Sequence, residues 1–135
     1  MSEKILVVDD DPDVMLFNKT VVEEEGYLPL TASNGEEGLA LLKKESPDLV
    51  ILDVLMPKQS GIKMYRAVKT EERWRHIPII ILSGISRRSF LKSQEALTEF
   101  GEQPVPEPEL YLEKPVEARD LAAAIREVLE KSKIT

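Results

Sequence analysis

The chain alternates short apolar runs with longer segments in which apolar residues recur every three or four positions. The runs lie at 5–8, 28–32, 49–52, 79–82 and 110–112. Runs of this length are typical of buried strands, and the spacing between them is typical of helices that bury one face. Because the second run contains Pro29, which lacks a backbone donor, we place it at an edge of the sheet. Strands that alternate with helices predict a parallel sheet with helices on both faces.

Capping residues and helix breakers predict where the helices begin and end. Asp11 and Pro12 open the first helix, and Gly26 ends it. Asn34 can cap the second helix, which stops before Pro47. A third helix follows the loop after the third strand, a polar helix runs from about 87 to 100, and an apolar stripe marks the last helix.

Five strands in 135 residues predict one α/β domain over 1–135, with its core at about 4–131. The expected fold is flavodoxin-like and doubly wound, with a five-stranded parallel sheet in the order 2-1-3-4-5. In such a sheet the functional site lies beyond the carboxyl ends of the strands, at the switch point between the first and third strands. The residues that directly follow the strands are therefore the first candidates for function.

Composition narrows the classes of function. The chain has no cysteine and one histidine, His76, which excludes a disulfide framework, a thiolate zinc site and a multi-histidine metal site. We expect His76 at the surface. A net charge of −7 argues against nucleic acid and against anionic membrane lipid as partners. The apolar runs are too short to span a bilayer and the amino terminus lacks a signal peptide, so we expect a cytoplasmic protein.

Polar residues follow four of the five predicted strands. Asp9 and Asp10 follow the first strand, and the third, fourth and fifth strands are followed or ended by Asp53, Ser83 and Lys114. Since neighbouring strands lie about 5 Å apart, the carboxylates should cluster and favour a bound cation. Carboxylate oxygens with room for water suit Mg²⁺. A metal, a lysine and a hydroxyl together suit the oxygens of a transferred phosphoryl group, and a carboxylate can be its nucleophilic acceptor.

Four motifs carry a family resemblance, each after its expected strand: VVDDDP, LDVLMP, ILSG and YLEKP. Together they resemble the CheY-like receiver domain of bacterial two-component response regulators. The resemblance implies that Asp53 is the phosphoacceptor of a phosphorelay. It also implies that Asp10, Asp53 and the backbone carbonyl of Leu55 bind Mg²⁺, with Asp9 acting through water.

The same resemblance assigns the remaining site residues. Lys114 matches the lysine that contacts the phosphoryl group, and Ser83 and Tyr111 match the hydroxyl and the aromatic residue of the switch. Pro115 matches the proline that closes a cis peptide bond in the family. A receiver of this kind is a signalling switch and not an enzyme.

The resemblance further implies the partners. A sensor histidine kinase or a phosphotransfer protein donates the phosphoryl group, and a separate target protein reads the result. The expected output surface comprises the helix at 87–100, the strand at 110–112 and the last helix, and a homodimer would use the same face. Because the chain ends shortly after the last helix, we expect a stand-alone receiver domain.

Two alternatives belong to other classes of function. A Mg²⁺-dependent phosphatase of the haloacid-dehalogenase type also uses an aspartyl nucleophile, but Asp53 lacks the second carboxylate of its Asp-x-Asp pattern. An unphosphorylated binding module with the receiver fold is the other alternative. The intact set of Asp10, Asp53, Ser83 and Lys114 argues against it.

One segment departs from the family pattern. The stretch from Ser83 to Lys114 is longer than is usual and contains a proline-rich segment at 103–108. Prolines supply no backbone donor for a strand ladder, so we expect this segment to stay exposed. Because it borders the expected output surface, we expect it to influence the choice of partner.

Overall fold

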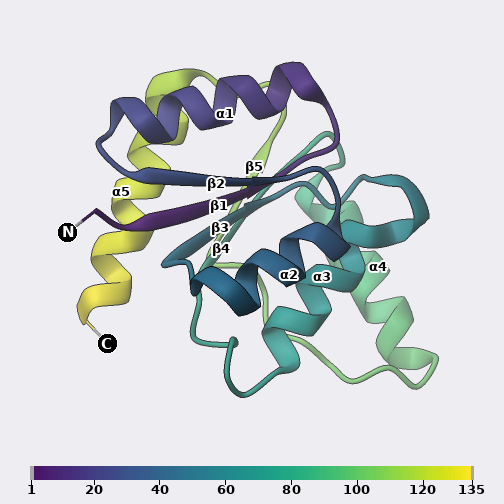
Figure 1. Cartoon of the computed structure of the whole chain (residues 1–135). Helices are drawn as coiled ribbons and strands as arrows, with labels where there is room; N and C mark the ends of the chain where they lie inside the picture. Colours follow the sequence, from purple (N-terminus) through teal and green to yellow (C-terminus); the bar gives the residue numbers. More distant parts are fainter. Residues whose placement is uncertain (1, 135) are drawn as a thin grey trace.

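A five-stranded parallel sheet forms the centre of the molecule (Figure 1). The computed structural model describes residues 2–134. The strands are β1 (Lys4–Val8), β2 (Leu28–Ala32), β3 (Leu49–Leu52), β4 (Ile79–Ser83) and β5 (Leu110–Glu113). They lie in the order β2-β1-β3-β4-β5. The predicted α/β class, the strand order and the edge position of β2 are therefore confirmed.

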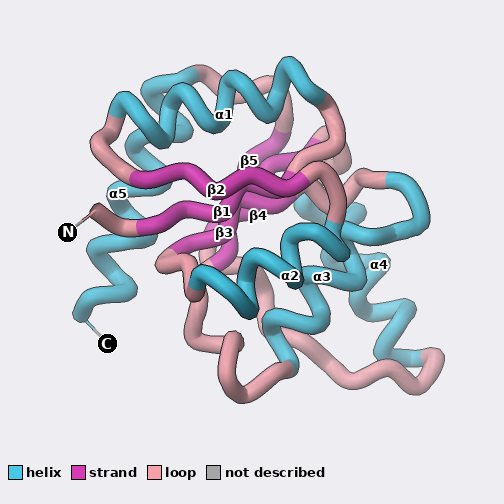
Figure 2. Tube along the Cα trace, in the orientation of Figure 1, coloured by secondary structure: helices cyan, strands magenta, loops and turns pink. Residues whose placement is uncertain are grey.

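Helices cover both faces of the sheet (Figure 2). They are α1 (Pro12–Glu24), α2 (Gly35–Glu45), α3 (Ser60–Thr70), α4 (Arg87–Glu99) and α5 (Ala118–Ile134), with a short 3-10 helix, η1 (Pro57–Gln59), before α3. In Figure 1, α1 and α5 lie on one face, and α2, α3 and α4 lie on the other. The predicted caps are present: Asp11 accepts hydrogen bonds from the N–H groups at the start of α1, and Asn34 does the same for α2.

The two faces of the sheet bury separate hydrophobic cores. Alternate residues of one strand point to opposite faces, so Ile51 packs under α1 and α5 while Leu52 packs under α2, α3 and α4. Because both faces are covered, every residue of β3 and β4 is buried. These central strands therefore read as unbroken apolar runs in the sequence.

Gly61 allows α3 to begin directly against the exit of β3. A Cβ atom at this position would lie 2.3 Å from the carbonyl oxygen of Asp53 and 2.7 Å from the Cα of Val54. Both atoms belong to the backbone, which cannot turn aside as the end of a flexible side chain can. Only glycine fits, and the close approach fixes the loop that follows Asp53.

We expect Gly61→Ala to lower the free energy of unfolding by about 1–3 kcal/mol, because the added methyl group would displace the backbone at Asp53. Gly84→Ala is the matched control, since a Cβ at Gly84 meets nothing within 4 Å. Equilibrium unfolding in urea measures both variants. Equal stability of the two variants would contradict the close-packing argument.

Candidate functional site

Three carboxylates meet at the carboxyl edge of the sheet. Asp9 and Asp10 follow β1 and Asp53 follows β3, and each offers an oxygen that lies within 4.8 Å of the other two. Asp9 and Asp53 are buried, with 2% and 4% of their surface exposed, whereas Asp10 is exposed. The structure thus brings together the acidic residues predicted at the switch point.

Donors from three directions hold the carboxylate of Asp53. Its Oδ1 accepts hydrogen bonds from the Ser83 hydroxyl at 2.7 Å and from the Leu55 N–H at 2.9 Å. Its Oδ2 accepts one from the Lys114 Nζ at 3.2 Å. Ser83 ends β4 and Lys114 directly follows β5, so the order of the strands places both side chains beside Asp53.

Lys114 lies between two of the carboxylates. Its Nζ is 3.0 Å from Asp9 Oδ2 and 3.2 Å from Asp53 Oδ2. Burial disfavours the charged form of Lys114, but the hydrogen bond to Asp9 and the charge of Asp53 outweigh it and raise the pKa of the lysine. The peptide bond from Lys114 to Pro115 is cis, the geometry that the resemblance implies.

The site keeps an excess of negative charge. Burial raises the pKa of Asp9, while the Asp11 N–H and the Lys114 ammonium act in the opposite direction. One ammonium among three carboxylates leaves the site able to hold a divalent cation. Carboxylate oxygens, one of them on the exposed Asp10, are the donor set that Mg²⁺ prefers.

Tyr111 is bonded to the loop that follows Ser83. It is half-buried on β5, and its hydroxyl donates to the carbonyl oxygen of Ile85 at 2.7 Å. Burial, followed by the charges of Glu113 and Asp53, raises its pKa to about 12. The phenol is therefore protonated at neutral pH and remains a donor.

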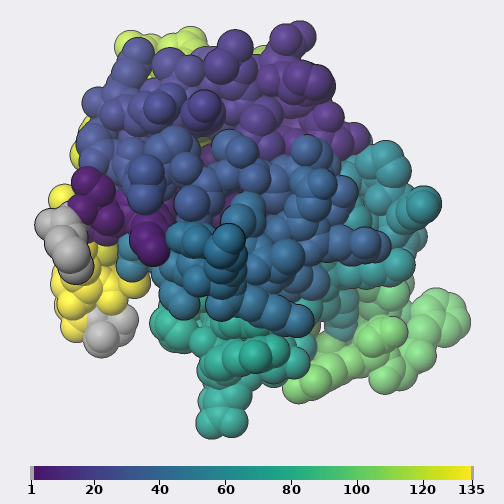
Figure 3. All heavy atoms as spheres, in the orientation of Figure 1, coloured from purple at the N-terminus to yellow at the C-terminus, as the bar shows by residue number. Residues whose placement is uncertain are grey.

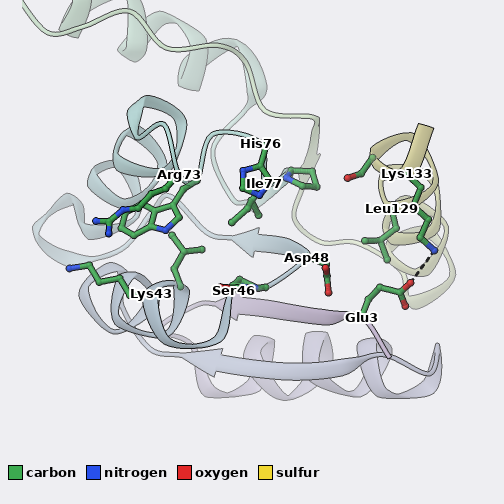
Figure 4. A pocket seen from close by; sticks show the side chains of 14 residues that line it. Glu3, Lys43, Ser46, Asp48, Arg73, His76, Ile77, Leu129 and Lys133 are labelled. Carbon is green, nitrogen blue, oxygen red and sulfur yellow. Dashed lines mark ion pairs between the residues drawn. The ribbon is translucent and has the colours of Figure 1, made fainter. Parts of the chain in front are cut away.

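His76 lies at the amino ends of the strands, on the side of the sheet opposite the carboxylates, beside a pocket of about 420 Å³ (Figure 4). It precedes β4, whereas Asp53 and Ser83 lie at the carboxyl ends of their strands. The guanidinium of Arg73 covers the Trp74 ring in the same pocket, at 4.3 Å from the ring centroid. The surface position predicted for His76 is confirmed, and it lies away from the carboxylate cluster.

An apolar groove of about 290 Å³ beside Lys114 was not predicted. Phe17 of α1 and Pro115 contribute to its lining. The apolar spacing of α1 favours a buried Phe17, yet 37% of its surface is exposed, and Asn18 is buried next to it. The buried residues of α1 are Asn18, Val21 and Val22, so its buried face is shifted toward Asn18, and the polarity of that residue conceals the shift in the sequence.

A model of the response regulator receiver domain matches residues 5–126. The chain belongs to this family. Receiver domains are signalling switches, and they bind Mg²⁺ at an acidic pocket and receive phosphoryl groups from histidine kinases or phosphotransfer proteins. In the part of the chain from 2 to 134, the structure has no helix that is both long and apolar enough to cross a membrane.

Relatives of different length share this receiver domain. Protein PilH of Pseudomonas aeruginosa is 33% identical over 126 residues, which cover 93% of the chain and 97% of PilH. The probable transcriptional regulator ycf27 of Porphyra purpurea is 37% identical over 134 residues, which cover 98% of the chain but 50% of ycf27. The chain thus spans about half the length of this curated relative.

A solved receiver structure has the same fold. The crystal structure of a CheY-like response regulator receiver domain protein from Methanospirillum hungatei JF-1 matches with a TM-score of 0.79 at 28% identity. The match covers 98% of each chain. The flavodoxin-like CheY fold is therefore shown for nearly the whole receiver.

We expect Lys114→Met to lower the free energy of unfolding by about 1–3 kcal/mol, because the buried carboxylates of Asp9 and Asp53 lose the cation that they share. Lys4→Met is the matched control. It breaks a partly exposed pair with Glu45 at 3.5 Å and should cost less than about 1 kcal/mol. Urea unfolding at neutral pH measures the free energy of unfolding of both variants. Equal losses of stability would show that Lys114 contributes no more than an exposed ion pair does.

Proposed function

We propose that the chain is a phosphorylation-controlled switch in which Asp53 accepts the phosphoryl group. The observation that carries this proposal is the buried Asp53 carboxylate, which Ser83, Lys114 and a backbone N–H hold in one orientation. A fixed carboxylate suits in-line attack on phosphorus. The ammonium and the hydroxyl beside it are donors for the oxygens of a transferred phosphoryl group.

The proposed transfer exchanges one bond to phosphorus for another. A carboxylate oxygen of Asp53 attacks the phosphorus of a phosphohistidine, and a P–O bond forms while the P–N bond breaks. The imidazole nitrogen retains the electron pair of the broken bond and takes up a proton. Water later attacks the acyl phosphate, releases inorganic phosphate and restores the carboxylate.

We assign the metal ligands to Asp10, Asp53 and the backbone carbonyl of Leu55, with Asp9 acting through water. Mg²⁺ supplies neutralising charge to the phosphoryl oxygens when it is bound. Asp10 is exposed and accepts no hydrogen bond from any residue between 2 and 134, so its oxygens are open to a cation. The oxygens of Asp9 and Asp53 all accept hydrogen bonds, so the water-mediated role of Asp9 follows from the family resemblance and not from these contacts.

Ser83 and Tyr111 would transmit the phosphorylated state. A phosphoryl group on Asp53 offers the Ser83 hydroxyl a new acceptor, and Tyr111 is bonded to Ile85, two residues after Ser83. Only an interaction that differs between two states can shift their populations. A change at Ser83 would therefore alter the surface formed by α4, β5 and α5, which is also the face proposed for a homodimer.

The proposed donor is a sensor histidine kinase or a phosphotransfer protein that acts on one receiver domain over 1–135. The groove lined by Phe17 and Pro115 supports this, because it places apolar surface for a donor protein directly beside Lys114. The proposed reader of the phosphorylated state is a separate target protein, as the family resemblance implies.

The Mg²⁺ assignment is tested with Asp10→Asn, which removes one charged ligand. We expect a roughly tenfold or greater loss of Mg²⁺ affinity, measured by titration of amide chemical shifts. Asp48→Asn is the matched control, since it removes the same charge at the opposite edge of the sheet. Unchanged affinity in Asp10→Asn would refute the ligand assignment.

Phosphorylation is tested with acetyl phosphate and Mg²⁺. The parent should gain one hydroxylamine-labile phosphoryl group by intact mass, and Asp53→Asn should gain none, because an amide is not a nucleophile here. Ser83→Ala is the control that keeps the acceptor. It should be phosphorylated but show a smaller change in the amide chemical shift of Tyr111 than the parent does.

The same experiment separates the alternatives. Phosphate on a serine or on His76 would contradict the receiver mechanism. Continuous turnover of a generic phosphate ester would favour the phosphatase. No labelling of the parent would favour the unphosphorylated binding module.

A further inference from the structure

The connection between α4 and β5 is fastened to the body of the molecule. We call residues 101–109 the strap. The Tyr65 hydroxyl donates to the carbonyl oxygen of Pro106 at 2.6 Å, and the Lys69 Nζ contacts the two carboxylate oxygens of Glu109 at 2.6 and 2.9 Å. The Lys69 side chain is 1% exposed, so it depends on Glu109 as its counter-ion. The strap is largely exposed, as predicted, but it runs alongside α3 and is bonded to it (Figure 1).

A groove of about 450 Å³ lies between α4 and the strap. Leu91, Pro104 and Val105 give it apolar surface, and Glu95 and Glu99 of α4 add carboxylates. Its lining comes from α4 and the strap and includes no residue of β5 or α5, so it lies on the strap side of α4 and shares only that helix with the expected output surface. The end of α4 and the start of the strap form a projecting corner of the molecule (Figure 3).

The charges of the groove favour a basic occupant. Neither Glu95 nor Glu99 forms an ion pair with any residue in the described part of the chain, whereas Glu107 of the strap is paired with Arg87. Phe100 directly follows α4, with 88% of its surface exposed. Apolar surface beside unpaired carboxylates complements a segment that carries lysine or arginine around an aliphatic side chain.

Aromatic contacts connect the strap to the loop beside Asp53. Tyr65, which bonds Pro106 of the strap, packs edge-on against Phe90 at 5.3 Å between ring centroids. Phe90 in turn lies 5.6 Å from Tyr111, which is bonded to Ile85. Tyr65 and Phe90 are completely buried, so neither ring can move without moving its neighbour.

We propose that this groove docks a basic, aliphatic segment of the target protein, and that the contacts from Tyr111 through Phe90 and Tyr65 make its affinity depend on Asp53. The dependence on Asp53 rests on the proposed function. The docking itself does not, because the groove is present in the unphosphorylated protein.

Docking is tested on the unphosphorylated protein with a synthetic helical peptide of lysine and leucine. We expect amide shifts to concentrate at Leu91, Glu95 and Val105. The Glu95→Gln/Glu99→Gln double variant should bind about three- to tenfold more weakly. Glu23→Gln/Glu72→Gln, which removes equal charge from exposed sites outside the groove, should bind as the parent does.

A second peptide, in which serine replaces leucine, tests the apolar surface without altering the protein. It should bind more weakly at the same charge. Equal binding of the two peptides, or equal weakening in the two double variants, would show that the peptide is held only by nonspecific electrostatic attraction to the acidic protein. Either result would overturn the proposal. Concentration-dependent shifts at the groove without peptide would assign it to a second copy of the chain, and would also overturn it.

The link to Asp53 is tested by repeating the titration after phosphorylation has been verified by intact mass. We expect the dissociation constant to change in the parent, and to change less in Tyr65→Phe, which keeps the ring but loses the bond to Pro106. A phosphorylated parent with unchanged affinity would overturn the link. A parent that takes up no phosphoryl group would instead refute the proposed function, and the docking result would stand separately.

Discussion

The ammonium of Lys114 is the interaction on which the carboxyl edge of this molecule depends. Asp9 and Asp53 are buried side by side, and the Lys114 Nζ contacts both carboxylates, at 3.0 and 3.2 Å. A buried charge is costly unless it is paired in this way. The lysine compensates the two buried charges and leaves Asp10 for solvent. The ammonium neutralises part of the negative charge, which stabilises the folded site. The negative charge that remains can attract a metal ion. The same lysine and carboxylates thus determine both the stability of the site and its affinity for a cation.

Much of this site could be predicted from the sequence because each part depends on a local pattern. An apolar strand that ends in a polar residue places that residue at the carboxyl edge, and the parallel sheet brings four such ends together, those of β1, β3, β4 and β5. Asp53, Ser83 and Lys114 could be predicted as site residues without information on contacts between distant parts of the chain. The caps at Asp11 and Asn34 are equally local, since each bonds to backbone N–H groups within three residues.

The features that were missed depend on pairs far apart in the chain. Lys69 occupies an ordinary polar position of α3, and it is buried only because Glu109 meets it from forty residues away. The strap therefore appears in the sequence as a loose insertion, although three side chains of α3, those of Tyr65, Arg66 and Lys69, bond to it. The exposed Phe17 has a similar origin, because its position depends on how α1 is rotated on the sheet and not on the spacing of its residues.

The place of Pro29 in β2 has a consequence for how the protein resists aggregation. Leu28 donates its N–H to Glu3, and the carbonyl of Ala32 accepts from Asp9, so residues 28, 30 and 32 direct their backbone groups toward β1. The alternate residues, Pro29 and Thr31, face away from the sheet. Since proline has no N–H, an incoming strand would find a donor only at Thr31. The free margin of β2 is thus a poor template for intermolecular β-sheet growth, without any charged residue in the strand.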